Sequence, residues 1–222
     1  MIASRRTRLG VAAALIAAGL ALLGEQLWLT AKAAFAAVLI DRALVAHLKD
    51  AGHHRPWSWA DLYPIARLEV PRLGVRRAVL SGASGSSLAF GPGHVDGTAW
   101  PGSPGNVVIA GHRDSWFAFL ADLEVGDEIM VTTPGRTVRY RAVETTVVHA
   151  SDVAVLDSTA ADTLTLITCY PFHGLRSARL RYVVRALAAQ PAAGKASALV
   201  VNALPAAYTT EIGAPLRGLR PA

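Results

Sequence analysis

The sequence predicts an all-β domain, either a barrel or a sandwich, over residues 57–188, with further segments on both sides. Two observations support this fold class. Short runs of apolar and β-branched residues alternate with turns rich in glycine and proline, as in folds made of many short strands. No helical pattern recurs between successive strands, so the strand–helix–strand rhythm of a parallel sheet is missing. The chain of 222 residues has room for one domain with appendages.

The beginning of the chain predicts a basic N-terminus, residues 1–8, and a membrane anchor over residues 9–31. Overall, 52% of the residues are apolar and the mean hydropathy is +0.34, with the excess concentrated here. Leu9–Gly24 carries no charge and extends roughly 24 Å as a helix. Continuing it to Leu29 reaches the bilayer core thickness of about 30 Å. Glu25 then falls near an interface, where a carboxylate costs less than at mid-membrane.

Arginines before this segment predict its orientation. Arg5, Arg6 and Arg8 favour a cytoplasmic N-terminus, so we expect a single-pass protein of the inner (plasma) membrane with its folded domain on the periplasmic side. A cleaved signal peptide is the alternative, since Ala31-Lys32-Ala33 is similar to a cleavage site. The uncleaved anchor is favoured because the apolar helical pattern continues into a predicted helical linker, residues 32–56.

The predicted elements of the folded domain follow in chain order. Ser81–Gly105 is too rich in glycine, serine and proline for a long helix or strand. Ser115–Asp122 predicts a short helix with Asp114 or Ser115 as its N-cap, and Pro134-Gly135 predicts a hairpin turn. Residues 189–222 predict a disordered tail. The expected strands are 67–70, 75–80, 106–110, 128–133, 137–148, 163–169 and 178–186.

Charge and cysteine content narrow the function. The net charge is +6 and the isoelectric point is near 10.0, but the basic residues are scattered and no recognition helix is present, which argues against nucleic-acid binding. An anionic envelope surface suits these charges better. Cys169 is the one cysteine, so it cannot form an internal disulfide. In an exported protein, a leftover thiol marks a candidate reactive residue.

Alternation along two predicted strands places this thiol and several arginines on faces that point away from the core. In residues 178–186 the even-numbered side chains are apolar, and Arg179 and Arg181 lie on the odd-numbered face. In residues 163–169 leucines mark the core face, which leaves Cys169 on the other one. If the two strands pair, the thiol and a guanidinium line one groove.

These residue types suit acyl transfer by a cysteine. A thiol becomes a useful nucleophile when a base or cation lies nearby, and His112, at the end of strand 106–110, is a candidate acid and base. An arginine can hold a developing oxyanion without exchanging protons. Ordinary structural roles stay open for each residue taken alone, because a lone cysteine is usually a buried apolar residue. No histidine shows metal-ligand spacing with Cys169.

The motifs resemble those of one family. Thr165-Leu166-Ile167-Thr168-Cys169, with Arg181 on the next strand, resembles the signature of the sortases. Gly111-His112-Arg113-Asp114 is similar to a second sortase motif. The resemblance covers residues 57–188, and the Cys-Tyr-Pro-Phe ending and the predicted anchor are most similar to the subtype of Gram-negative bacteria. Two further motifs precede the histidine in the same order, Gly91-Pro92-Gly93-His94 and Pro101-Gly102-Ser103-Pro104-Gly105-Asn106.

The resemblance implies a closed β-barrel of about eight strands with short helices, acting as a cell-envelope transpeptidase without cofactor or metal. By similarity, Cys169 attacks the Thr–Gly carbonyl of an LPXTG-like sorting signal at the C-terminus of a substrate protein. His112 serves as acid and base, and Arg181 holds the substrate and the oxyanion. An amine acceptor then resolves the thioacyl intermediate, with water as a slower alternative.

Two positions and two rival functions qualify this expectation. Trp116 stands where relatives of this subtype often carry histidine, so substrate or loop details can differ. Arg179 is the alternative arginine, but an apolar strand follows Arg181, as it follows the family's arginine. An L,D-transpeptidase would normally show Ser-x-Gly-Cys-x-x-Arg, and Leu166–Cys169 lacks the glycine. A non-catalytic β-barrel binding module would need no reactive thiol. His94 is expected to be structural.

Overall fold

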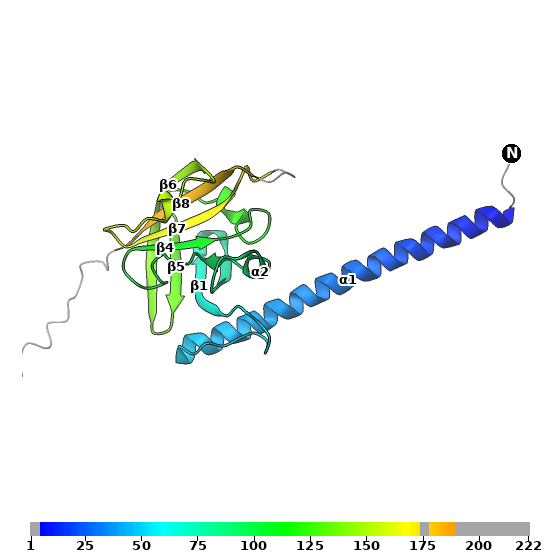
Figure 1. Cartoon of the computed structure of the whole chain (residues 1–222), viewed down its shortest axis with the longest axis horizontal. Coiled ribbons are helices and arrows are strands. Elements are labelled where there is room, and N and C mark those ends of the chain that lie inside the picture. The colour runs from blue at the N-terminus through cyan, green and yellow to red at the C-terminus, as the bar shows by residue number, and fades with distance from the viewer. Residues whose placement is uncertain (1–4, 174–177, 190–222) are drawn as a thin grey trace, which may run out of the picture. The chain divides into compact units, whose positions relative to one another are not determined.

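The protein begins with one long helix. The structure, a computed structural model, describes residues 5–173 and 178–189 (Figure 1), and helix α1 spans Arg5–Asp50. The helix ends at Ala51, which has a positive φ of 59°, and the Asp50 side chain accepts a hydrogen bond from the Gly52 N–H at 2.8 Å. The predicted tail, residues 189–222, lies outside the described residues apart from its first one.

The C-terminal end of α1 is attached to the folded domain. Ile40 packs in a buried cluster with Leu62 and with Leu80 of strand β2 (Val75–Leu80). Two carbonyl groups contact the His47 ring, Gly52 at 2.8 Å and Ile65 at 3.1 Å. The end of the helix is therefore part of the domain's packing and not only a linker to it.

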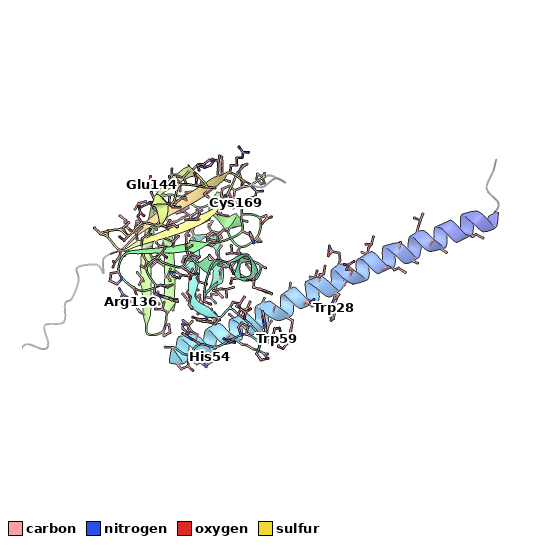
Figure 2. The ribbon with its side chains drawn as sticks, in the orientation of Figure 1. Trp28, His54, Trp59, Arg136, Glu144 and Cys169 are labelled. Carbon is pink, nitrogen blue, oxygen red and sulfur yellow. The ribbon has the colours of Figure 1, made fainter. Side chains whose placement is uncertain are left out.

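The predicted membrane anchor is wrong. Within the described residues, no helix combines the length and the apolar character needed to cross a membrane. The segment 9–31 is rich in alanine and glycine, which contribute little apolar surface, and α1 carries Glu25, Gln26 and Lys32 close in sequence to Trp28 (Figure 2). The expected single-pass placement in the inner membrane, with the domain on its periplasmic side, depended on this span and is corrected with it.

The strands of the described residues form a closed barrel with the order β1-β2-β3-β4-β7-β8-β6-β5, which confirms the all-β class and the expected eight-stranded barrel (Figure 1). Most neighbours pair antiparallel, but β2 pairs parallel with β3, and β4 pairs parallel with β7. The strands are β1 (Pro64–Val70), β2 (Val75–Leu80), β3 (Gly93–His94), β4 (Asn106–Ala110), β5 (Glu128–Thr133), β6 (Arg136–His149), β7 (Thr163–Tyr170) and β8 (Leu180–Ala188).

Short helical turns connect the strands. The expected helix over 115–122 is a turn followed by the 3-10 helix η2, and the stretch 81–105, expected to be irregular, contains both α2 and strand β3. Two-residue and four-residue elements are set by the tertiary contacts around them, and no sequence periodicity reveals elements of this length. The turns are η1 (Pro71–Leu73), α2 (Gly85–Leu88), η2 (Ala118–Ala121) and η3 (Ala154–Leu156).

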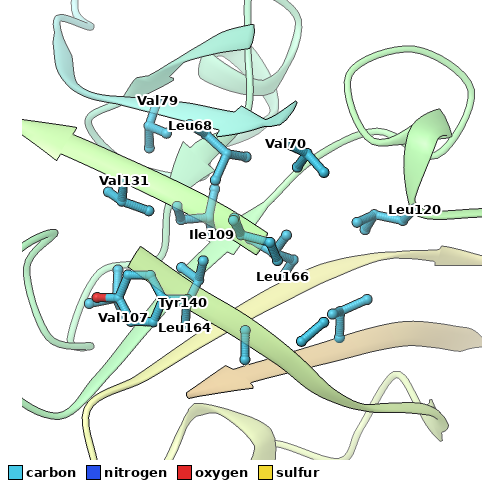
Figure 3. Packing of buried hydrophobic residues seen from close by; sticks show 14 of the residues in the cluster. Leu68, Val70, Val79, Val107, Ile109, Leu120, Val131, Tyr140, Leu164 and Leu166 are labelled. Carbon is cyan, nitrogen blue, oxygen red and sulfur yellow. The ribbon is translucent and has the colours of Figure 1, made fainter. Parts of the chain in front are cut away.

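The barrel interior is filled by one main apolar cluster (Figure 3). The leucines Leu164 and Leu166 of β7 belong to it, as do Val184 and Ala186 of β8. Both strands therefore turn the predicted faces inward. The opposite faces of the two strands, one of which carries Cys169, point out of the barrel.

A second, smaller cluster covers part of the outer face. It consists of Val108 on β4, Ile167 on β7, Val183 on β8 and Val155 from η3, and each is at most 9% exposed. The connection between β6 and β7 contains η3, which packs on the outside of these three strands and buries the side chains of the cluster. The face that bears Cys169 and Arg181 is thus apolar at its centre.

Candidate active site

Cys169 and Arg181 are direct partners in the antiparallel ladder between β7 and β8. Residues opposite each other in such a ladder point to the same side of the sheet, with Cβ atoms about 4.5–5.5 Å apart. Both side chains are half-buried, and the thiol is free. Arg181 is therefore the arginine that the ladder brings beside the thiol, from the face of the second apolar cluster.

His112 reaches the same place from the other side of β7. In the parallel β4–β7 ladder, Ala110 pairs with Ile167, and two further residues along both chains lead to His112 and Cys169. The ladder's hydrogen bonding continues past Ala110, since the Gly111 N–H donates to the Ile167 carbonyl at 3.1 Å. His112 is exposed. By these pairings the three predicted residues lie at one level on three neighbouring segments, with the cysteine in the middle.

The turn that carries His112 is anchored by the residues around it. The buried hydroxyl of Thr168 donates to the Gly111 carbonyl at 2.7 Å. After the histidine, the Phe117 N–H donates to the His112 carbonyl at 2.9 Å, and the Trp116 indole N–H donates to the Leu88 carbonyl at 3.0 Å. The backbone on both sides of the imidazole is therefore fixed to the barrel and to α2.

Gly111 is required by close packing in this turn. A Cβ atom at this position would lie 2.7 Å from Cγ of the buried Phe117 ring. We expect Gly111→Ala to lower the free energy of unfolding by about 1–3 kcal/mol, because the ring or the turn must shift. Urea titration measures the change. Gly85→Ala is the matched control, since a Cβ there meets nothing within 4 Å. Equal stability of Gly111→Ala and wild type would show that the turn absorbs the methyl group.

Arg181 is on β8 and is held by backbone carbonyls near the start of this strand, whereas Arg179 lies before it. Nη1 of Arg181 donates to the carbonyls of Ala178 at 2.9 Å and Leu180 at 3.0 Å. No carboxylate of the described residues forms an ion pair with this guanidinium, so its charge is not cancelled locally. Arg179 lies before the first residue of β8 and its side chain is exposed.

The other positions singled out in the sequence have structural surroundings. His94 is 2% exposed; its Nε2 contacts the Ala99 carbonyl at 2.9 Å and its ring stacks on Trp100. Trp116 borders a pocket of about 220 Å³ between α1 and β2, and the lining of this pocket includes none of the three candidate residues. Among the described residues, no cluster of His, Cys, Asp and Glu is arranged to hold a metal ion.

The barrel is closed and has eight strands, and the Cys169 thiol lies between the turn that carries His112 and the strand that carries Arg181. These features define a class of β-barrel proteins with a candidate cysteine site. The family model "Sortase domain" matches residues 68–189, more than half of the chain. The protein therefore belongs to the sortase family, and the expectation of a family of cysteine transpeptidases is confirmed. The subtype of Gram-negative bacteria stays a prediction.

Individual relatives are similar over the barrel. The chain is 30% identical to sortase D of Bacillus subtilis over 118 residues, which are 53% of this chain and 60% of that protein. A Clostridium perfringens sortase D5 transpeptidase has a similar structure, with a TM-score of 0.53 and 32% identity, covering 58% of this chain and 80% of that one. Sortase A from Corynebacterium diphtheriae gives 0.55 and 29%, covering 62% and 66%. The match spans less than two thirds of the curated relative.

Proposed function

We propose that this protein is a cysteine transpeptidase that cleaves an LPXTG-like sorting signal and joins the shortened protein to an amine. The direct pairing of Cys169 with Arg181, at the level of His112, carries the proposal. It gives a nucleophile, a proton carrier and an oxyanion partner on one face of the barrel. We propose residues 57–188 as the catalytic domain.

Each residue has one task in the proposed reaction. The Cys169 thiol gives its proton to His112 and its sulfur attacks the carbonyl carbon of the Thr–Gly bond, while the Arg181 guanidinium stabilises the negative oxygen that forms. His112 gives a proton to the departing glycine nitrogen, the C–N bond breaks, and a thioester remains on Cys169. An incoming amine then attacks this thioester, transfers a proton to His112 and releases the thiolate.

The thiol and Arg181 lie at the edge of the second apolar cluster, which η3 covers. Ile167 and Val183 lie two residues from Cys169 and Arg181 on the same face, within the second apolar cluster. The charge of Arg181 lies at the end of this cluster, where the scissile carbonyl must be held.

The test incubates the full chain with an LPXTG-type peptide, with and without an amine such as triglycine. Mass spectrometry is expected to find a ligated product that requires the amine, and slower hydrolysis when the amine is left out. A peptide in which alanine replaces the threonine is the matched substrate control. Absence of both cleavage and ligation would reject the proposed function for this class of signal.

Replacement of the two arginines separates their roles. We expect Arg181→Ala to lower kcat by about 10²–10³, the usual loss when an oxyanion donor is removed. Arg179→Ala is expected to stay within a few-fold of wild type and to act mainly on KM, because Arg179 lies before β8 and has no partner in the β7–β8 ladder. Both kinetic constants are measured with the same peptide. The assignment is reversed if Arg179→Ala shows the large loss in kcat and Arg181→Ala does not.

A further inference from the structure

We propose that Arg113 is a positioning residue, which keeps the His112 imidazole in register with the Cys169 thiol by tying together the chain segments that follow β4 and β7. The roles of His112 and Cys169 in this inference rest on the proposed function. Arg113 directly follows the histidine, and its Nη1 donates to the carbonyl of Pro171 at 2.8 Å. Pro171 follows the cysteine by two residues, so this bond joins the two candidate segments across 58 positions of sequence.

The bond completes a bracket around the site. On the barrel side, Gly111 is joined to β7 by the hydrogen bond from its N–H to the Ile167 carbonyl and by the one from Thr168 to its own carbonyl. The Arg113–Pro171 bond lies beyond His112 and Cys169, on the far side from the barrel ladder. His112 and Cys169 therefore stand between hydrogen bonds on both sides, and Arg113 supplies the outer one.

The exposed setting of His112 explains why an outer tie matters. The histidine lies outside strand β4 and its side chain is exposed, so neighbouring side chains restrict it little. Proton transfer requires the ring within hydrogen-bond reach of the reacting groups, and misplacement by about 1 Å can cost a hundredfold in rate. Arginine suits this tie because its guanidinium stays charged and offers several N–H donors in a fixed plane.

The test uses the pH profile of Cys169 alkylation in the full chain, with iodoacetamide as the probe. Cys169 is the only thiol, so the rate reports on one residue and needs no peptide substrate. We expect Arg113→Ala to shift the profile toward that of His112→Ala and to lower kcat/KM by about tenfold to a hundredfold, mainly through kcat. Arg113→Lys keeps a donor and the charge and should recover part of the loss.

Arg136→Ala is the matched control. Its Nη1 donates to the Gly102 carbonyl at 2.8 Å, the same kind of exposed arginine–carbonyl tie, at a part of the barrel well separated from Cys169 (Figure 2). Its alkylation profile should coincide with that of wild type. A wild-type profile in Arg113→Ala would overturn the proposal. The proposal would also be overturned if the alkylation profile of wild type at about 1 M salt coincided with that of Arg113→Ala. Salt screens charges, so the loss in Arg113→Ala would then come from its charge and not from its hydrogen bond.

The two proposals fail in different ways. If the alkylation profile depends on His112 and Arg113 but no peptide is turned over, the positioning role stands and the sorting-signal function is rejected. If peptide is ligated but Arg113→Ala matches Arg136→Ala in both measurements, the function stands and the positioning role is rejected. An unfolding titration of each variant confirms that the compared proteins are folded.

Discussion

Replacing Cys169 with alanine is expected to abolish transpeptidation and to leave the barrel folded. The sulfur is the only thiol of the chain, so no second residue can form the thioester. The side chain is half-buried on the outer face, outside the main cluster that fills the barrel. We therefore expect the free energy of unfolding to change by less than about 1 kcal/mol, as for most substitutions away from a core.

The measurement compares wild type and Cys169→Ala for ligation of the same peptide to the same amine. The full chain is preferable to a form without α1, because Ile40 and His47 of this helix contact the barrel. Cys169→Ser is the matched variant: it keeps the size of the side chain but replaces the thiol by a far weaker nucleophile. Turnover by either variant at a rate comparable to wild type would remove the thioacyl mechanism.

Replacing His112 with alanine should reduce turnover almost as strongly. The imidazole must protonate the departing amine and later accept a proton from the incoming one, and general acid–base catalysis typically contributes 10²–10⁴-fold. The ladder places His112 level with Cys169, and among the described residues no other histidine belongs to the turn after β4. We expect the loss in kcat and little change in KM, because the ring is not needed to hold the peptide.

His149→Ala is the matched control for this loss. His149 is also an exposed histidine at the end of a strand, where its Nδ1 contacts the Ser151 hydroxyl at 2.7 Å. It pairs with Leu180, one position from Arg181, and should leave both constants within a few-fold of wild type. Comparable losses in the two variants would point to a general effect of charge near the site and against a specific role for His112.

Much of the fold was predictable because the strands are long enough to show their alternation. The residues 75–80, 106–110 and 128–133 form strands at the predicted bounds. The core faces of β7 and β8 also follow from alternation alone, since Leu164 and Val184 point inward as expected. The side-by-side placement of Cys169 and Arg181 needed one more fact, the pairing register, which alternation cannot supply.

The features that sequence reasoning missed depend on contacts between distant segments. Ile167 and Val183 lie on the face that points away from the barrel interior, yet they are buried because η3 from the β6–β7 connection covers them. Arg113 was part of a recognised motif, but its role could not be inferred because its partner is a backbone carbonyl. The wrong prediction at residues 9–31 has another origin. The run without charge indicated a membrane span, but alanine and glycine give this run little apolar surface.

The parallel pairing of β4 with β7 has a consequence for the order of events during folding. The Thr168–Gly111 hydrogen bond joins residues 57 positions apart, and closing so large a loop costs chain entropy before any contact compensates for it. Contacts of this separation form slowly compared with the local β5–β6 hairpin. On the ribosome, the histidine turn emerges well before the cysteine and the arginine. In a nascent or partly folded chain Cys169 therefore lacks its proposed partners His112 and Arg181, and the proposed reaction requires the closed barrel.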